Sequence, residues 1–131
     1  MTTNDKVIYW TELSDYDFET TIAMLYTGRY LYVGFMCHQV IEKIFKAFYS
    51  KLKEEMPPYS HKLAYLAIQG GFYELFNEEQ QKFIDQLEPL NIKTRYPDYK
   101  KELAKKLTQE KCREIIDNTK ILQQWIKEQL L

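Results

Sequence analysis

YLYVGFMCHQVIEKIFKAFYSKLKEE, residues 30–55, is the stretch that decides the fold. Its apolar residues recur every three or four positions, which is the period of a helix with one buried face. Gly34 weakens the helix and therefore indicates a close contact with another helix, and Pro57 and Pro58 end it. The apolar face consists of Val33, Cys37, Val40, Ile41, Ile44, Phe45, Phe48 and Leu52.

Shorter amphipathic segments lie on both sides of this long helix. Residues 1–13 are expected to be an irregular or extended lead, and Ser14 is expected to be the N-cap of a helix that ends at Gly28. A short helix over residues 61–69 is expected after Ser60 as its cap, and Gly70 and Gly71 end it.

The second half of the chain repeats this pattern. Asn77 and Gln80 resemble a capping box for a fourth helix, which Pro89 bends or shortens. Residues 95–98 are expected to be an ordered loop and residues 99–106 a further helical turn, and the last helix starts near Thr108. The sequence therefore predicts an all-α, up-and-down bundle of about five helices with two long central helices, the second and the fifth.

The bulk properties fit one globular domain. The chain has 131 residues, 45% of them hydrophobic, and a net charge of -1, which argues against a generally basic nucleic-acid-binding surface. Cys37 and Cys112 fall in apolar helical stretches and are expected to be buried free thiols. No signal peptide or membrane-length apolar run is visible, so we expect a cytoplasmic protein without a membrane contact.

Several motifs of well-known chemistry are absent from the sequence. There is no Walker A sequence, GxGxxG, HExxH, GxSxG or EF-hand loop, and no cysteine and histidine cluster of the zinc type. We therefore expect neither a metal nor a cofactor.

The two histidines are the first candidates for a functional site. His38 lies beside the apolar face of the long helix with Glu42 one turn on, so it is either a packed, hydrogen-bonded group or an imidazole oriented by Glu42 for acid–base or nucleotide contact. His61 follows Ser60 at a helix start, where it either holds the loop or contacts an anion or nucleotide.

Basic and aromatic residues supply the other candidates. Lys43 and Lys46 form either a solvated face or a short basic strip for phosphates. In the loop Thr94-Arg95-Tyr96-Pro97-Asp98-Tyr99, Arg95 either locks the bundle through a carboxylate or binds a phosphate, while Tyr96 or Tyr99 stacks on a base.

These segments, in this order, resemble the HEPN domain family over about residues 14–127. His38-Gln39-Val40-Ile41-Glu42-Lys43-Ile44-Phe45-Lys46-Ala47 is similar to the family's His-Gln-x-x-Glu-Lys-x-x-Lys-Ala segment. The resemblance also rests on three further segments, Gly28-Arg29-Tyr30 with Val33-Gly34-Phe35, Ser60-His61-Lys62-Leu63, and Arg95-Tyr96-Pro97-Asp98.

The resemblance implies one helical domain over residues 1–131 that contacts nucleotides or RNA, often as a homodimer, and often beside a minimal nucleotidyltransferase in a toxin–antitoxin-like pair. It implies nucleotide or RNA contacts at His38, Lys43, Lys46, His61, Arg95, Tyr96 and Tyr99. Catalytic relatives are metal-independent RNases with an Arg-x4-6-His motif, and here no arginine precedes either histidine at that spacing.

Three functions therefore stay open at the level of sequence. The first is a nucleotide- or RNA-associated binding module. The second is a divergent metal-independent RNase that uses His38 or Arg95, with Arg95 stabilising the developing negative charge. The third is a structural helical adaptor whose polar residues only lock helices together.

Overall fold

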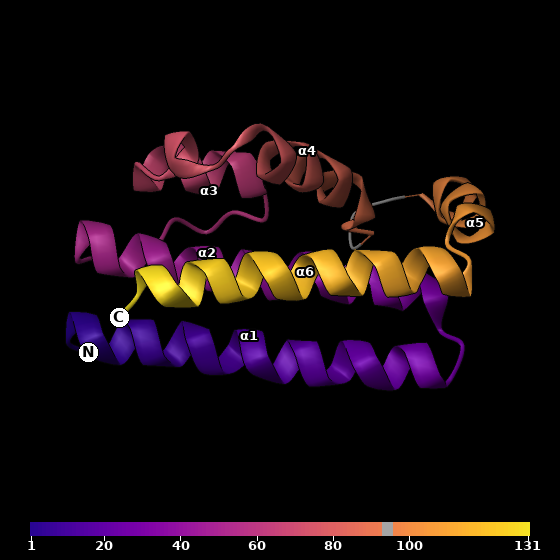
Figure 1. The fold of residues 1–131 in the computed structure, drawn as a ribbon, viewed down its shortest axis with the longest axis horizontal. Helices are drawn as coiled ribbons and strands as arrows, with labels where there is room; N and C mark the ends of the chain where they lie inside the picture. The colour runs from indigo at the N-terminus through magenta and orange to yellow at the C-terminus, as the bar shows by residue number, and fades with distance from the viewer. Residues whose placement is uncertain (93–95) are drawn as a thin grey trace.

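Three long helices lie side by side in the computed structural model, which describes residues 1–92 and 96–131 (Figure 1). They are α1 (Thr3–Tyr26), α2 (Tyr30–Lys53) and α6 (Gln109–Gln129). α1 and α2 form an antiparallel hairpin whose turn contains Gly28, with a φ of 73° that suits glycine. The C-terminal helix runs parallel to α2.

The shorter helices cover α2 on the side away from α1 (Figure 1). They are α3 (Leu63–Gly70) and α4 (Glu78–Leu87), followed by α5 (Pro97–Lys106) at one end of the molecule. Two single 3-10 turns, η1 (Tyr73–Leu75) and η2 (Glu88–Leu90), flank α4. This crossover carries the chain from the end of α2 back to the start of α6.

α2 is the central element, because all the other helices of the described chain are arranged around it. It contacts α1, α3, α4, α5, α6 and η2. Gly34 confirms the close approach expected there, since a Cβ atom on it would lie 3.2 Å from Leu107 Cδ1 and 3.4 Å from Leu90 Cδ1. Leu52, expected on the inward face, is instead 46% exposed near the end of the helix.

The all-α bundle is confirmed, although the described residues form six α-helices and three of them are long. Gly71 ends α3 with a φ of 78°, and Asn77 and Gln80 form the expected capping box. Thr108 caps α6 as expected. α5 starts at Pro97 where a loop was expected, because proline is well suited to the first turn of a helix.

The N-terminal segment was predicted wrongly, since it is the first half of α1. Thr2 and Asp5 form a capping box that starts the helix there. Ser14 is in the helix interior and fully buried, and its hydroxyl donates to the carbonyl oxygen of Val40 at 2.8 Å. Gln123 Nε2 donates to the same Ser14 hydroxyl at 3.0 Å, so one serine joins α1, α2 and α6.

Both cysteines are buried free thiols, as expected. Burial raises the pKa of Cys37 to about 12, against a smaller opposing effect of the neighbouring Thr119 side chain. Burial also raises the pKa of Cys112 to about 11. Both side chains therefore stay protonated at neutral pH and act as packing groups.

Phe45 anchors the aromatic core, and its truncation is the first test of this fold. Its ring is fully buried and lies 5.4 Å from Phe72 and 5.5 Å from Phe76, centroid to centroid. We expect Phe45→Ala to lower the free energy of unfolding by about 3–5 kcal/mol in urea denaturation, because it leaves a cavity. Leu52→Ala, on the exposed side of the same helix, is the control and should cost about 0.5 kcal/mol. Equal losses would contradict this packing.

Candidate functional site

A column of polar residues runs along one buried face of α2. His38, Glu42 and Lys46 are spaced four residues apart, so they follow one another along the same side of the helix. They are 0%, 1% and 5% exposed, respectively. Buried charges are stable only when they are paired, so the partners of this column define the site.

Glu42 is the centre of the column. Its Oε2 accepts a hydrogen bond from Lys46 Nζ at 3.2 Å, and its Oε1 lies 3.0 Å from His61 Nδ1. The Lys46 ammonium lies 5.1 Å from the ring centroid of Trp10 in α1, a cation–π distance. The carboxylate thus connects α2 to the segment before α3, and its lysine extends the connection to α1.

His61 is the part of this cluster that reaches solvent. It lies just before α3, and its side chain is 31% exposed. The Glu42 carboxylate accepts a hydrogen bond from Nδ1–H, so the other ring nitrogen, Nε2, lies on the opposite side of the ring. The ring of Tyr59, which is 90% exposed, lies edge-on at 5.5 Å. A held imidazole and a free aromatic ring thus share one surface.

Glu88 completes the cluster from η2. Its Oε1 accepts from the backbone N–H of Leu63 at 2.9 Å and its Oε2 from that of Ala64 at 3.4 Å. Its Oε1 also lies 3.7 Å from His38 Nε2, an ion-pair distance too long for a hydrogen bond. Burial opposes ionisation of Glu88, but His38 and the two N–H groups outweigh it and lower the pKa of the carboxyl.

The start of α3 therefore differs from the expectation based on Ser60. The helix begins at Leu63, and the Ser60 hydroxyl accepts only from the N–H of Lys62, at 3.2 Å. Glu88 supplies the acceptor that helix starts need, from 25 residues along the chain. Sequence reasoning missed Glu88, because a glutamate before a proline carries no local signal of such a contact.

The remaining candidates lie apart from this cluster or outside the described residues. Lys43 Nζ donates to Asp17 Oδ2 at 2.9 Å and to Gln39 Oε1 at 3.1 Å, and so ties α2 to α1. Tyr96 is 83% exposed before α5. Tyr99 donates its hydroxyl to the carbonyl oxygen of Pro89 at 3.0 Å, next to Glu88. Arg95 lies outside the described residues.

Two kinds of feature are absent from the described residues. Within residues 1–92 and 96–131, no group of three or more histidine, cysteine, aspartate or glutamate side chains is arranged to hold a metal ion. No helix in this described part of the chain has the length and apolar character needed to span a membrane.

Glu42 offers a direct test of the cluster. We expect Glu42→Gln to lower the free energy of unfolding by about 3 kcal/mol in urea denaturation, because Lys46 would stay buried without a charge partner. Glu102→Gln is the matched control, since Glu102 pairs with Lys105 on the exposed surface. That pair should contribute less than about 0.5 kcal/mol. Similar losses in the two variants would argue against a paired buried charge.

Comparison with known proteins finds one matching family profile and a solved structure of similar fold. The profile of the HEPN domain family matches residues 7–129. Among solved structures, the chain is similar to the crystal structure of TT1696 from Thermus thermophilus. The TM-score is 0.77 at 19% sequence identity, over 94% of this chain and 97% of the other, so the likeness is one of fold. No curated protein matches the chain significantly.

Proposed function

Because the chain belongs to the HEPN domain family, we propose that it is a nucleotide- or RNA-associated binding module. In this proposal the module works as a homodimer with a minimal nucleotidyltransferase partner, in a toxin–antitoxin-like pair. The family supports the nucleotide or RNA association. The partner and the pairing rest on the sequence resemblance alone.

The observation that carries the proposal is the half-open position of His61 beside the buried Glu42. The imidazole is held at 3.0 Å by a carboxylate that is itself fixed by Lys46, so its free side keeps one orientation. Side chains fixed in this way bind ligands at a low entropic cost. His61 is therefore the histidine that a ligand meets at the protein surface, since His38 is fully buried behind it.

Tyr59 favours a single-stranded ligand for this surface. Its ring is 90% exposed and adjacent to His61, so an unpaired base has a platform on which to stack. Bases in a duplex are already stacked on each other and do not need that platform. The net charge of -1 agrees with a short ligand, because long duplexes are bound through many basic residues.

The same geometry favours an RNase as the second candidate. The Glu42–His61 pair has the arrangement of an oriented general base. His61 Nε2 takes the proton of a ribose 2′-hydroxyl, the 2′-oxygen forms a bond to the adjacent phosphorus, and the bond from phosphorus to the 5′-oxygen breaks. The 5′-oxygen leaves with a proton from water, and the imidazolium returns its proton to solvent.

Binding of a fluorescein-labelled single-stranded RNA, followed by anisotropy, tests the module. We expect Tyr59→Ala to weaken binding about tenfold, because a stacked base contributes roughly 1–3 kcal/mol. His61→Ala should weaken it as well, and Tyr26→Ala, which removes a 79% exposed ring at the end of α1, should leave it unchanged. Absence of binding by the wild type, with stability losses only, would favour the structural adaptor.

The same proteins separate the binding module from the RNase. In a denaturing-gel assay with EDTA, cleavage by the wild type that disappears in His61→Ala would establish the second candidate. RNA binding without cleavage would support the first candidate, the binding module.

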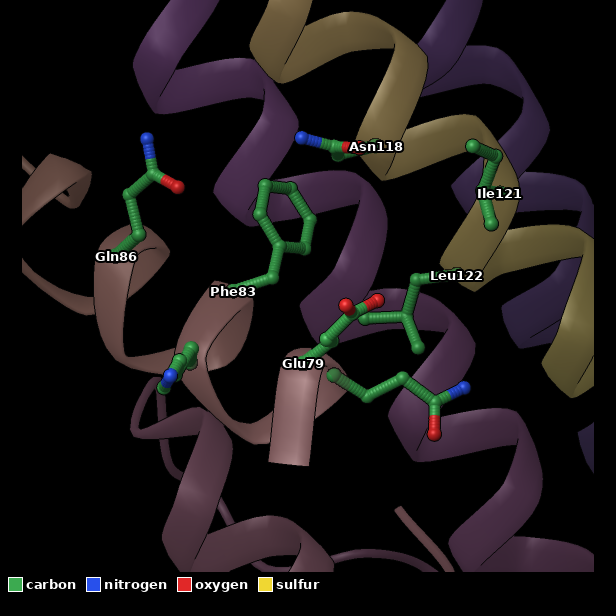
Figure 2. Close-up of a pocket in the computed structure, with 8 residues that line it drawn as sticks. Glu79, Phe83, Gln86, Asn118, Ile121 and Leu122 are labelled. Carbon is green, nitrogen blue, oxygen red and sulfur yellow. The ribbon is translucent and has the colours of Figure 1, made fainter. Parts of the chain in front are cut away.

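The face around Ile121 supports the homodimer. Ile121 in α6 is 67% exposed and lies between two hollows that it helps to line. One is a groove of about 370 Å³ between α4 and α6, with Phe83 and Leu122 in it (Figure 2). About a two-fold axis, Ile121 of each copy can enter a hollow of the other copy, so the same face serves both partners. Both charge signs rim the groove, as Glu79 and Lys82 show.

We expect Ile121→Asp to convert the homodimer to a monomer, because a buried unpaired carboxylate opposes association. Sedimentation velocity across micromolar concentrations measures this change. Ile68→Asp is the matched control, since Ile68 is 59% exposed on α3 and should leave the mass unchanged. A monomeric wild type, or dissociation by both variants, would overturn this assignment of the face.

A further inference from the structure

Three N–H groups converge on the place that the Glu88 carboxylate occupies. Two are the backbone N–H groups of Leu63 and Ala64 in the first turn of α3. The third belongs to His38, whose Nε2 lies 3.7 Å from Glu88 Oε1. Gln39 Nε2 lies 3.4 Å from His38 Nδ1 and can only donate, so Nδ1 accepts this bond and Nε2 carries the ring proton. Glu42 Oε1 lies 3.9 Å from the same Nδ1, which is too far for a competing hydrogen bond.

The carboxylate satisfies only part of this cradle. Each of its two oxygens accepts from one backbone N–H of α3. His38 Nε2 has no hydrogen-bond partner, although its side chain is fully buried. A buried N–H without a partner is unfavourable, and in its observed position the Glu88 carboxylate leaves one of the three donors without a hydrogen bond.

We propose that this cradle, formed by His38 and the first turn of α3, binds a phosphoryl group, and that Glu88 closes it in the free protein. A phosphoryl group presents three oxygens in a tetrahedral arrangement and can therefore serve all three donors. The start of a helix also favours a bound anion. The inference rests on the proposed function, because it names the part of a nucleotide or RNA that the site binds.

Glu88 is placed to open and close the cradle. Its side chain is 31% exposed, so the carboxylate can rotate into water while the backbone stays in place. The backbone next to it is held by Tyr99, whose hydroxyl donates to the Pro89 carbonyl oxygen. After the exchange His38 still faces an anion, and the Glu42–Lys46 ion pair behind it keeps its own contacts.

Titration with inorganic phosphate tests the cradle, at constant ionic strength, by following the backbone amides of Leu63 and Ala64 and the His38 ring by NMR. We expect Glu88→Ala to bind phosphate at least tenfold more tightly than the wild type, in which the carboxylate must first be displaced. Glu19→Ala removes the same charge from an exposed position on α1 and should bind no more tightly than the wild type. A 5′-phosphorylated RNA should bind Glu88→Ala more tightly than its 5′-hydroxyl form if the ligand phosphate is terminal.

Equal affinities of Glu88→Ala and Glu19→Ala for phosphate, or shifts at other amides, would overturn the proposal. Glu88→Gln serves if the alanine variant does not fold, because it keeps the size of the side chain and should also bind phosphate more tightly. RNA binding by the wild type without phosphate binding in the variants would reject the cradle and keep the proposed function. Phosphate binding by Glu88→Ala without any RNA or nucleotide binding would support the cradle and reject the proposed function.

Discussion

A buried carboxylate on the central helix is the constraint on which the rest of the structure depends. Glu42 is 1% exposed, so its charge must be balanced within the protein. Lys46 and His61 supply that balance, and Lys46 also lies over Trp10. Three separate parts of the chain are therefore linked through Glu42 and its partner Lys46. Apolar residues of similar volume often give equal stability in such places, so the buried charge is explained better by the positioning of His61 than by stability.

The same constraint explains why α2 is buried on almost every side. One face is apolar and packs in the usual way, with Phe45 against Phe72 and Phe76. Another carries the polar column, which Ser50 continues by donating its hydroxyl to the Lys46 carbonyl oxygen at 2.8 Å. Such a column needs a cover of polar partners, and the segment around α3 and η2 provides it. The candidate site is thus the contact between this cover and the central helix.

Local signals in the sequence predicted most of the helices, and distant contacts account for the errors. The capping pair Asn77 and Gln80 and the cap Thr108 act on their own helices, so they could be read directly. The residue type of Ser14 and the aspartates that follow it are typical of a helix cap, but its hydroxyl donates a hydrogen bond to the Val40 carbonyl oxygen in another helix. The i,i+4 spacing placed Glu42 beside His38. Which histidine faces solvent depends on how α3 and η2 cover α2, and no local pattern contains that information.

The parallel course of α2 and α6 has a consequence for the order of folding. The α1–α2 hairpin contains short-range contacts and closes through one tight turn, so it is free to form early. Its polar interior is completed only by α6, because Gln123 reaches Ser14 across 109 positions and Lys51 Nζ donates to the Leu130 carbonyl oxygen at 2.7 Å. The face of the hairpin that packs against α6 therefore stays exposed to solvent during synthesis until the C-terminal helix has been made.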